Sequence, residues 1–149
     1  MRIPIRVIFA LVAVMLGAST GASSAQTQKA GTLIILATGF EHNDGQAGVN
    51  LFAKPDDLFD HPTRQVYAKI TDGRAEIVIP HLPYGNYALV VFHDENMNGN
   101  VDHNLFRFPS EPLGYPNGYR FGLKQGLPNF KKLQIQFSES SLPLNITVH

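Results

Sequence analysis

The sequence predicts an all-β fold, a single antiparallel β-sandwich of about seven strands with Greek-key connections. Short segments rich in branched and aromatic residues recur along the chain, and none of them sustains the 3.6-residue period of an amphipathic helix. Clusters of Gly, Pro, Asn and Asp separate these segments at short intervals, as turns do. Many short strands at such spacing are typical of a sandwich or a small barrel.

Each expected strand follows from a local pattern. The segment Thr32 to Thr38 is rich in branched residues and bounded by glycines, which indicates a central strand. Apolar and polar residues alternate from Leu133 to Phe137, as in a strand with one solvated face. The same criteria predict strands at 32–38, 49–53, 65–71, 75–79, 82–93, 133–137 and 142–148.

The connections carry their own signals. Residues 55–59 begin with proline and predict a single helical turn. The pair Asp72-Gly73 is a strong signal for a two-residue hairpin between the strands on either side. Pro80 and Pro83 bracket what we expect to be a crossover.

A Pro-x-Gly-x-Tyr run, from Pro83 to Tyr87, enters the most apolar strand. Such a run is typical of the tyrosine corner of Greek-key sandwiches, in which a tyrosine hydroxyl ties the backbone of the preceding loop. The alternative is a core tyrosine whose hydroxyl is solvated.

Residues 1–25 have the features of a signal peptide: a charged start, an apolar run at 7–16, and small residues before a cleavage site after Ala25. The apolar run of about ten residues is shorter than the ~20 that span a bilayer, so we expect cleavage and no retained transmembrane span. A flexible tail at 26–30 and a single domain at 31–149 would remain.

Composition limits the partners and the compartment. The signal segment holds two of the twelve basic residues, which leaves ten basic against twelve acidic side chains. A chain so close to neutral has no electrostatic basis for binding nucleic acid or anionic lipid. The absence of cysteine indicates a domain exported without disulfides, which fits a periplasmic or secreted bacterial protein.

The strongest chemical pattern is D-x-N-x-N-G-x-x-D. It places Asp94, Asn96, Asn98 and Asp102 at positions 1, 3, 5 and 9 of a calcium-type loop, with Gly99 at position 6. Oxygen side chains at alternating positions can converge on one cation, and the glycine permits the sharp turn between them. The pattern predicts a Ca²⁺ site.

The loop also departs from an EF-hand. Leu105 stands at position 12, where a bidentate Glu is expected, and Glu111 is the nearest carboxylate that could close the site. With so few carboxylates, we expect a weak, extracellular-type affinity of about 10⁻⁴ to 10⁻³ M. The alternative is a hairpin loop whose Asn and Asp side chains cap its own backbone.

Histidines offer a second metal hypothesis. His93 and His103 could hold a transition metal with Asp94 or Asp102. Adjacent residues of a strand point to opposite faces, which argues against a chelate of His93 with Asp94. Three further histidines lie in expected loops at irregular spacing, where a solvated surface position is the default: His42, His61 and His81.

Catalytic motifs are scarce. The chain has no cysteine, no Gly-x-Ser-x-Gly and no His-Glu-x-x-His. Asp94 and Glu111 could form a general acid/base pair, as in glycosidases, which would make the protein a small periplasmic hydrolase. A purely structural envelope protein without metal is the remaining alternative.

Aromatic residues are dense in the segment after the loop, namely Phe106, Phe108, Tyr115, Tyr119 and Phe121. They either pin a long loop to the edge of the domain or form an exposed platform for a sugar ring or a partner protein. As candidates for a ligand surface we take His93, Tyr115, Asn117 and Tyr119.

Three motifs carry a family resemblance. They are G-x-Y-A-x-x-x-x-H-D-x-N-x-N-G-x-x-D at 85–102, P-x-E-P-x-G-Y-x-N at 109–117 and P-x-F at 128–130. With them, residues from about 31 to the C-terminus resemble a family of exported bacterial proteins known as domain of unknown function 2141. The resemblance implies a periplasmic or secreted β-sandwich and brings no established activity.

Two positions depart from the family pattern, Arg107 in place of Gly and Pro116 in place of Ser, and both lie in the outer half of the central loop. The Pro-x-Gly-x-Tyr strand entry also resembles that of transthyretin-like and carboxypeptidase-regulatory-like sandwiches, and a transthyretin-like or Ig-like fold is expected. At the level of fold, this likeness implies an accessory or binding module.

These observations lead to one functional expectation. The chain is expected to be an exported, non-catalytic binding or accessory module whose Asp94–Asp102 loop binds Ca²⁺. Its partner is expected to be a small ligand or another envelope protein.

Overall fold

The computed structural model describes residues 28–106, 108–122, 125–141 and 143–149. The predicted signal peptide at 1–25 lies outside these residues. The predicted flexible tail is described only at its end, where it is already tied to the domain. The carbonyl of Lys29 accepts a hydrogen bond from the backbone N–H of Tyr84 at 3.0 Å, and Ala30 is the first residue of a strand.

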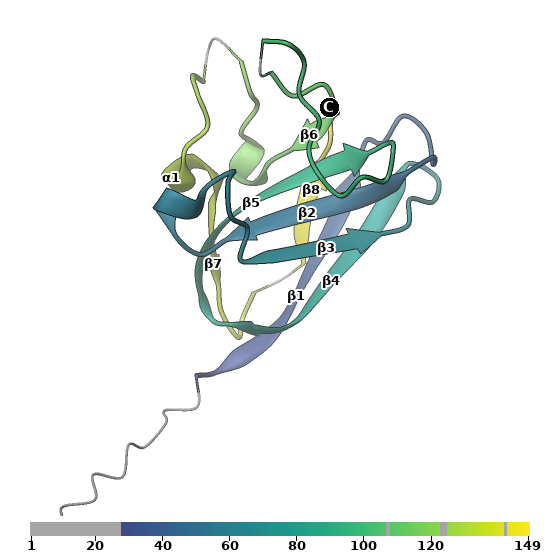
Figure 1. Cartoon of the computed structure of the whole chain (residues 1–149). Helices are drawn as coiled ribbons and strands as arrows, with labels where there is room; N and C mark the ends of the chain where they lie inside the picture. Colours follow the sequence, from purple (N-terminus) through teal and green to yellow (C-terminus); the bar gives the residue numbers. More distant parts are fainter. Residues whose placement is uncertain (1–27, 107, 123–124, 142) are drawn as a thin grey trace, which may run out of the picture.

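The described residues form two β-sheets (Figure 1). The first sheet has the order β4 (Arg74–Pro83), β1 (Ala30–Thr38), β8 (Leu144–Thr147). The second has the order β3 (Arg64–Ala68), β2 (Gln46–Phe52), β5 (Gly85–Asp94), β6 (Leu113–Gly114), and β7 (Gln134–Phe137) pairs with the opposite end of β5.

The helical segments are short: the 3₁₀ helices η1 (Pro55–Asp57) and η2 (Pro116–Gly118), and α1 (Phe130–Leu133). The first of them confirms the helical turn predicted after Pro55. Within the described residues, no helix has the length and apolar character needed to cross a bilayer.

The predicted all-β class is confirmed, while the sandwich with Greek-key connections stays a prediction. The expectation of a wholly antiparallel arrangement is corrected by β8, which runs parallel to β1 with Leu144 opposite Ile35. The chain reaches β8 from β7, a strand of the other sheet, rather than from β1 through a hairpin. A crossover of this kind does not impose the antiparallel direction that a tight turn imposes.

The core lies between the sheets. One buried cluster combines Ile35 and Ile77 of the first sheet with Val49 and Leu89 of the second. A second cluster covers the opposite face of β5 and includes its buried Val90. Burial of each large aliphatic side chain stabilises the fold by about 1.5–3 kcal/mol. Strand β5 is therefore buried on both faces, which explains its nearly unbroken apolar sequence.

The predicted turn at Asp72-Gly73 is present. Both residues have positive φ, +52° and +68°, and Thr71 and Arg74 exchange backbone hydrogen bonds of 2.8 and 3.1 Å across it. The predicted hairpin is wrong, however, because β3 pairs with β2 whereas β4 pairs with β1. The turn residues determine the local reversal, and burial of the two apolar faces determines which sheet each strand joins.

The expected crossover between Pro80 and Pro83 is also wrong, since β4 continues through both prolines. Proline has no N–H to give to a ladder, so it is tolerated on an edge strand. β4 is the edge of its sheet. The tyrosine corner is confirmed: the buried Tyr87 donates its hydroxyl to the carbonyl of Pro83 at 2.8 Å.

Candidate functional site

Strand β5 carries the candidate site, and its last two residues project to opposite faces. His93 lies on the face of the inter-sheet core, edge-on to Phe40 with ring centroids 5.3 Å apart. Asp94 lies on the other face, where Gln46 of the neighbouring strand donates to its carboxylate at 2.7 Å. Both side chains are 0% exposed. One strand end thus delivers an imidazole and a carboxylate to two separate environments.

Asp94 organises the start of the loop that follows. Its Oδ1 accepts the backbone N–H of Asn98 at 3.0 Å, and its Oδ2 accepts that of Gly99 at 2.9 Å. With Gln46, three donors satisfy one buried carboxylate. A charge removed from water is costly unless it is hydrogen-bonded in this way.

The remaining predicted calcium ligands join the same hydrogen-bonded loop. The amides of Asn96 and Asn98 both donate to the carboxylate of Asp102, at 2.7 and 2.9 Å. Their carbonyl oxygens accept the backbone N–H groups two residues further on, as in Asx turns. The structure therefore brings together the four residues that the sequence pattern selected.

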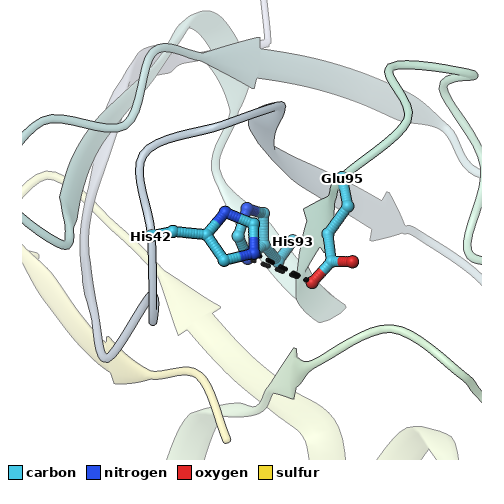
Figure 2. Close-up of side chains that lie close together, drawn as sticks. All are labelled: His42, His93 and Glu95. Atoms are coloured by element: carbon cyan, nitrogen blue, oxygen red, sulfur yellow. Dashed lines mark ion pairs between the residues drawn. The ribbon is translucent and has the colours of Figure 1, made fainter.

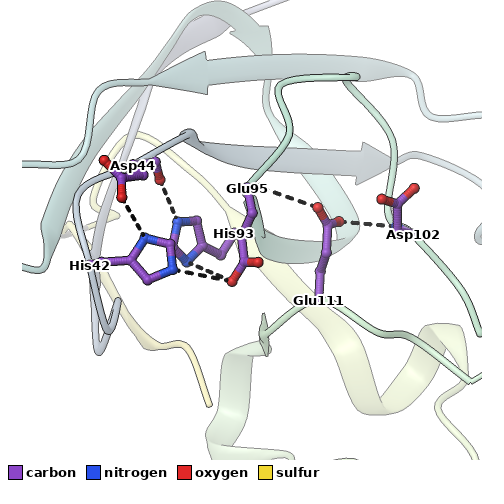
Figure 3. Close-up of polar contacts among 6 residues, drawn as sticks. All are labelled: His42, Asp44, His93, Glu95, Asp102 and Glu111. Atoms are coloured by element: carbon purple, nitrogen blue, oxygen red, sulfur yellow. Dashed lines mark hydrogen bonds and ion pairs between the residues drawn. The ribbon is translucent and has the colours of Figure 1, made fainter.

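The carboxylate of Glu111 accepts hydrogen bonds from both ends of this loop (Figure 3). Its Oε1 accepts the backbone N–H of Glu95 at 3.1 Å, and its Oε2 accepts that of Asp102 at 3.0 Å. Burial raises the pKa of Glu111 above its ordinary value, although the two backbone donors act in the opposite direction and the charge of Asp102 adds a smaller increase. The sequence spacing selected Glu111 as the carboxylate nearest the loop, and the structure places it there.

Leu105, at the position of the missing Glu, is fully exposed at 100% and takes no part in closing the loop. A second anchor comes from β3, where Tyr67 donates its hydroxyl to the carbonyl of Gly99 at 2.7 Å. Burial, and then the nearby charge of Asp94, raise the pKa of Tyr67. The loop is thus held on one side by Glu111 and on the other by Tyr67.

The aromatic segment divides into buried and exposed parts. Tyr115 and Tyr119 are only 8% and 7% exposed, pack edge-to-face at 5.1 Å and belong to the cluster behind β5. Burial, with a smaller effect of Tyr119, raises the pKa of Tyr115 to about 12. Phe106, Phe108 and Phe121 are exposed instead. The two tyrosines therefore pin the segment to the domain, and the phenylalanines face solvent.

The other ligand-surface candidates are also engaged within the domain. Asn117 donates its side-chain amide to the carbonyls of Lys132 and Gln134, at 3.2 and 2.8 Å, and so ties η2 to the start of β7. His93 is buried and presents no surface. Tyr115, the fourth candidate, lines a pocket.

This pocket lies beside the loop and has a volume of about 660 Å³. The loop contributes Asn100, Val101 and His103 to its wall. Five aromatic residues line it as well: Phe52, Phe59, Phe108, Tyr115 and Phe121. The lining of the pocket is thus largely apolar, with amide and imidazole groups at the loop side.

On the other face of β5, His93 meets two side chains that the sequence did not single out as metal ligands. His42 comes from the β1–β2 connection and Glu95 follows β5, and Figure 2 shows both side chains turned toward His93. Glu95 Oε1 lies 3.5 Å from His42 Nε2 and 3.9 Å from His93 Nδ1. Among the described residues, this is the group of histidine and carboxylate side chains close enough to hold one metal ion.

The predicted pairing of His93 with His103 is not part of that group: His103 is exposed and lines the pocket instead. Glu95 could have been found from the sequence, since residues i and i+2 of a strand share a face. His42 could not, because it reaches His93 through tertiary structure. The histidine prediction thus identified one of three residues in the cluster.

The hydrolase hypothesis required Asp94 and Glu111 to act on a substrate. Both carboxyl groups are buried, and every one of their oxygens accepts a hydrogen bond from the protein. A general acid or base must reach a substrate proton within hydrogen-bonding distance. Their surroundings favour a role in holding the loop.

Comparison with known proteins gives one match. A family model described as "Uncharacterized protein conserved in bacteria (DUF2141)" matches residues 35–145. No curated protein and no solved structure matches the chain.

Proposed function

Because the chain belongs to the family of uncharacterised proteins conserved in bacteria known as DUF2141, whose description names no activity, we propose its function from the geometry of its site. The protein is an exported, non-catalytic binding module of the periplasm or the secreted fraction. It takes a small ligand, or a side chain of an envelope partner, in the pocket beside the Asp94–Asp102 loop.

The pocket is the observation that carries this proposal. Its volume of about 660 Å³ lies within the ~300–1,000 Å³ range of small-molecule sites. Such sites are mostly apolar and aromatic, with a few polar groups that orient the ligand. Phe108 and Phe121, with ring centroids 6.1 Å apart, offer partly exposed faces at the pocket, and Asn100 offers a polar group. Two tilted aromatic rings and an amide suit a sugar ring or an aromatic side chain.

Binding in the pocket is tested by ligand-observed NMR with monosaccharides and short aromatic peptides as probes. We expect at least one of these probes to bind, and the variants Phe108→Ala and Phe121→Ala to weaken it by roughly tenfold each, about 1.4 kcal/mol. Phe106→Ala is the matched control, because Phe106 is 81% exposed and does not line the pocket. Binding of no probe, or equal losses in all three variants, contradicts the proposal.

The second part of the proposal is that the loop binds Ca²⁺ through Asp94, Asn96, Asn98 and Asp102, and that the ion stiffens one wall of the pocket. Hard cations take oxygen ligands, and each of these side chains supplies at least one. An oxygen that already accepts one hydrogen bond keeps a second lone pair. Rotation of an asparagine amide by half a turn exchanges its NH₂ group for its carbonyl oxygen.

Calorimetric titration with Ca²⁺ tests the loop. We expect one ion per chain with a dissociation constant of about 10⁻⁴ to 10⁻³ M, and a rise in melting temperature at saturating Ca²⁺. Asp102→Asn removes one carboxylate at the half-exposed end of the loop and should abolish the heat. Asp56→Asn, on the exposed 3₁₀ helix η1, should leave it unchanged. An absence of heat and of any thermal shift excludes Ca²⁺ as the ligand.

A structural envelope protein without metal is the second candidate, and a specific observation favours it. Both carbonyl oxygens of the paired asparagines accept backbone N–H groups, so the loop satisfies its own polar groups. The two titrations separate the candidates, since a purely structural protein binds neither the probes nor Ca²⁺.

A further inference from the structure

We propose that His42, His93 and Glu95 form a binding site for a divalent transition-metal ion, with zinc as the representative ion. This site is independent of the proposed pocket and of the calcium-type loop. It lies on the opposite face of the β5 terminus from Asp94, and it draws on different chemistry. Two imidazoles and one carboxylate converge in it, and the three ligand atoms all lie within 4.8 Å of one another (Figure 2).

The hydrogen bonding of His93 identifies the free nitrogen. Its Nε2 lies 2.8 Å from the backbone carbonyl oxygen of Asp44. A carbonyl oxygen only accepts hydrogen bonds, so Nε2 carries the proton and donates it. In the neutral ring Nδ1 then holds the lone pair, and Nδ1 is the atom directed at His42 and Glu95. A carbonyl that fixes the tautomer of a metal-binding histidine is a recurring feature of metal sites.

His93 Nδ1 is also a buried nitrogen without a hydrogen-bond partner among the described residues. The closest charged atom, Glu95 Oε1 at 3.9 Å, is too far for a hydrogen bond. A buried polar atom without a partner costs about 1–3 kcal/mol. A bound metal ion would satisfy this lone pair and remove that cost.

The groups behind the ligands are arranged as in a metal site (Figure 3). The backbone carbonyl of Asp44 accepts from His93 Nε2, and its exposed carboxylate lies 3.8 Å from His42 Nδ1, a distance that allows electrostatic attraction but no hydrogen bond. The backbone N–H of Glu95 is held by Glu111. Supporting carboxylates and carbonyls orient ligands and increase their basicity.

The dimensions fit a metal ion of the zinc type. Ligand atoms at about 2.0–2.1 Å from a tetrahedral ion are roughly 3.3–3.4 Å apart. The two pairs that include Glu95, at 3.5 and 3.9 Å, need only small movements to reach that spacing, and the two imidazole nitrogens, which lie within 4.8 Å of each other, must move closer together. The side chains of His42 and Glu95 are 44% and 48% exposed and so can adjust, while the buried His93 stays in place. Solvent therefore reaches the site, which leaves the fourth coordination position open to water.

The donor set selects the class of ion. Imidazole suits Zn²⁺, Cu²⁺, Fe²⁺ and Ni²⁺, whereas Ca²⁺ and Mg²⁺ prefer oxygen ligands alone. The site has no sulfur ligand, because the chain contains no cysteine. A divalent first-row transition metal is thus the expected occupant, and Ca²⁺ at a millimolar level of roughly 10⁻³ M should not displace it.

The test is a competition titration of the metal-free full chain with Zn²⁺ against a chromophoric chelator. We expect one ion per chain, and a binding constant that falls by more than about 100-fold in His42→Ala and in Glu95→Gln. His61→Ala is the matched control, since His61 is also an exposed loop histidine and should leave the affinity unchanged. Asp44→Asn should weaken binding by at most about tenfold, because the exposed carboxylate lies 3.8 Å from His42 Nδ1 and the backbone carbonyl that holds His93 is unchanged. His93 is left intact, because its burial would mix folding with binding.

Two further measurements keep the result independent of stability and of stray surface binding. The melting temperatures of metal-free His42→Ala and Glu95→Gln should match that of the parent, because the side chains of His42 and Glu95 are both exposed. Co²⁺ bound in place of Zn²⁺ should give the visible absorption of a four-coordinate ion, and Glu95→Gln should lose it. Absence of stoichiometric binding, or equal affinity in the parent, His42→Ala and Glu95→Gln, overturns the proposal.

Discussion

Replacement of Asp94 by Ala is expected to lower the free energy of unfolding by about 3 kcal/mol or more, even with all divalent ions chelated. The carboxylate is fully buried and accepts three hydrogen bonds, two of them from backbone N–H groups of the loop. Its removal leaves the Gln46 amide and the backbone N–H of Gly99 without this acceptor, whereas the N–H of Asn98 keeps Asn96 Oδ1. Each donor left unsatisfied costs about 1–3 kcal/mol. Urea denaturation of the parent and the variant measures the difference.

Asp102→Ala is the matched control in the same loop. Asp102 is only half-buried and accepts from two side-chain amides that water can satisfy instead, so the expected loss is below about 1 kcal/mol. If the two variants are equally stable, Asp94 does not organise the loop. Since the measurement is made in chelator, it is separate from any effect of Ca²⁺ binding.

The second large effect is expected at Gly48, in the middle of β2. A Cβ atom at this position would lie 2.3 Å from Cζ of Phe92, a ring that is fully buried and cannot move away. Replacing glycine by alanine makes the unfolded chain less favourable by about 0.4–1 kcal/mol, which alone would stabilise the fold. Overpacking costs about 1–3 kcal/mol and should win. Gly48→Ala is therefore expected to be destabilised by roughly 1–2 kcal/mol in urea denaturation.

The partner ring provides the check on this mechanism. Phe92→Ala alone should cost about 3–5 kcal/mol through the cavity it leaves. In the double variant the new methyl group occupies part of that cavity, so the combined loss should be smaller than the two single losses added together. Gly85→Ala is the control, because its Cβ would meet only Tyr87 at an ordinary 3.8 Å. Additive losses would show that contact with Phe92 is not the cause.

The loop and the histidine cluster share the end of β5 but differ in chemistry. The loop presents carboxylate and amide oxygens, and the cluster presents imidazole nitrogens. Glu111 touches both, because it holds the backbone N–H of Glu95 and that of Asp102. Titrations with Ca²⁺ and Zn²⁺ can still report on the two sites separately, because Asp102 belongs to the loop alone and His42 to the cluster alone. Loss of one metal without loss of the other is the expected pattern for Asp102→Asn and for His42→Ala.

Local sequence patterns predicted the elements that local chemistry controls. Branched residues between glycines indicated β1, and the pair Asp72-Gly73 indicated the turn that the structure contains. Where tertiary packing competes with local pattern, the prediction failed. Strand β7 begins at Gln134, one residue later than predicted, because Leu133 ends α1 and packs behind β5. The helix starts where Asn129 accepts the backbone N–H of Lys132, a capping contact that the alternation of residues does not reveal.

The sequence by itself determined the oxygen-rich loop, because its residues lie within nine positions and their spacing alone brings them together. It also pointed to Glu111, to the tyrosine corner and to the all-β class. The tertiary structure decided what the sequence could not, namely the pairing of β8 with β1, the pocket behind the loop, and the meeting of His42 with His93 and Glu95. The physical reason is distance along the chain. Groups about fifty residues apart meet only because two sheets bury their apolar faces, and that burial is a property of the whole fold.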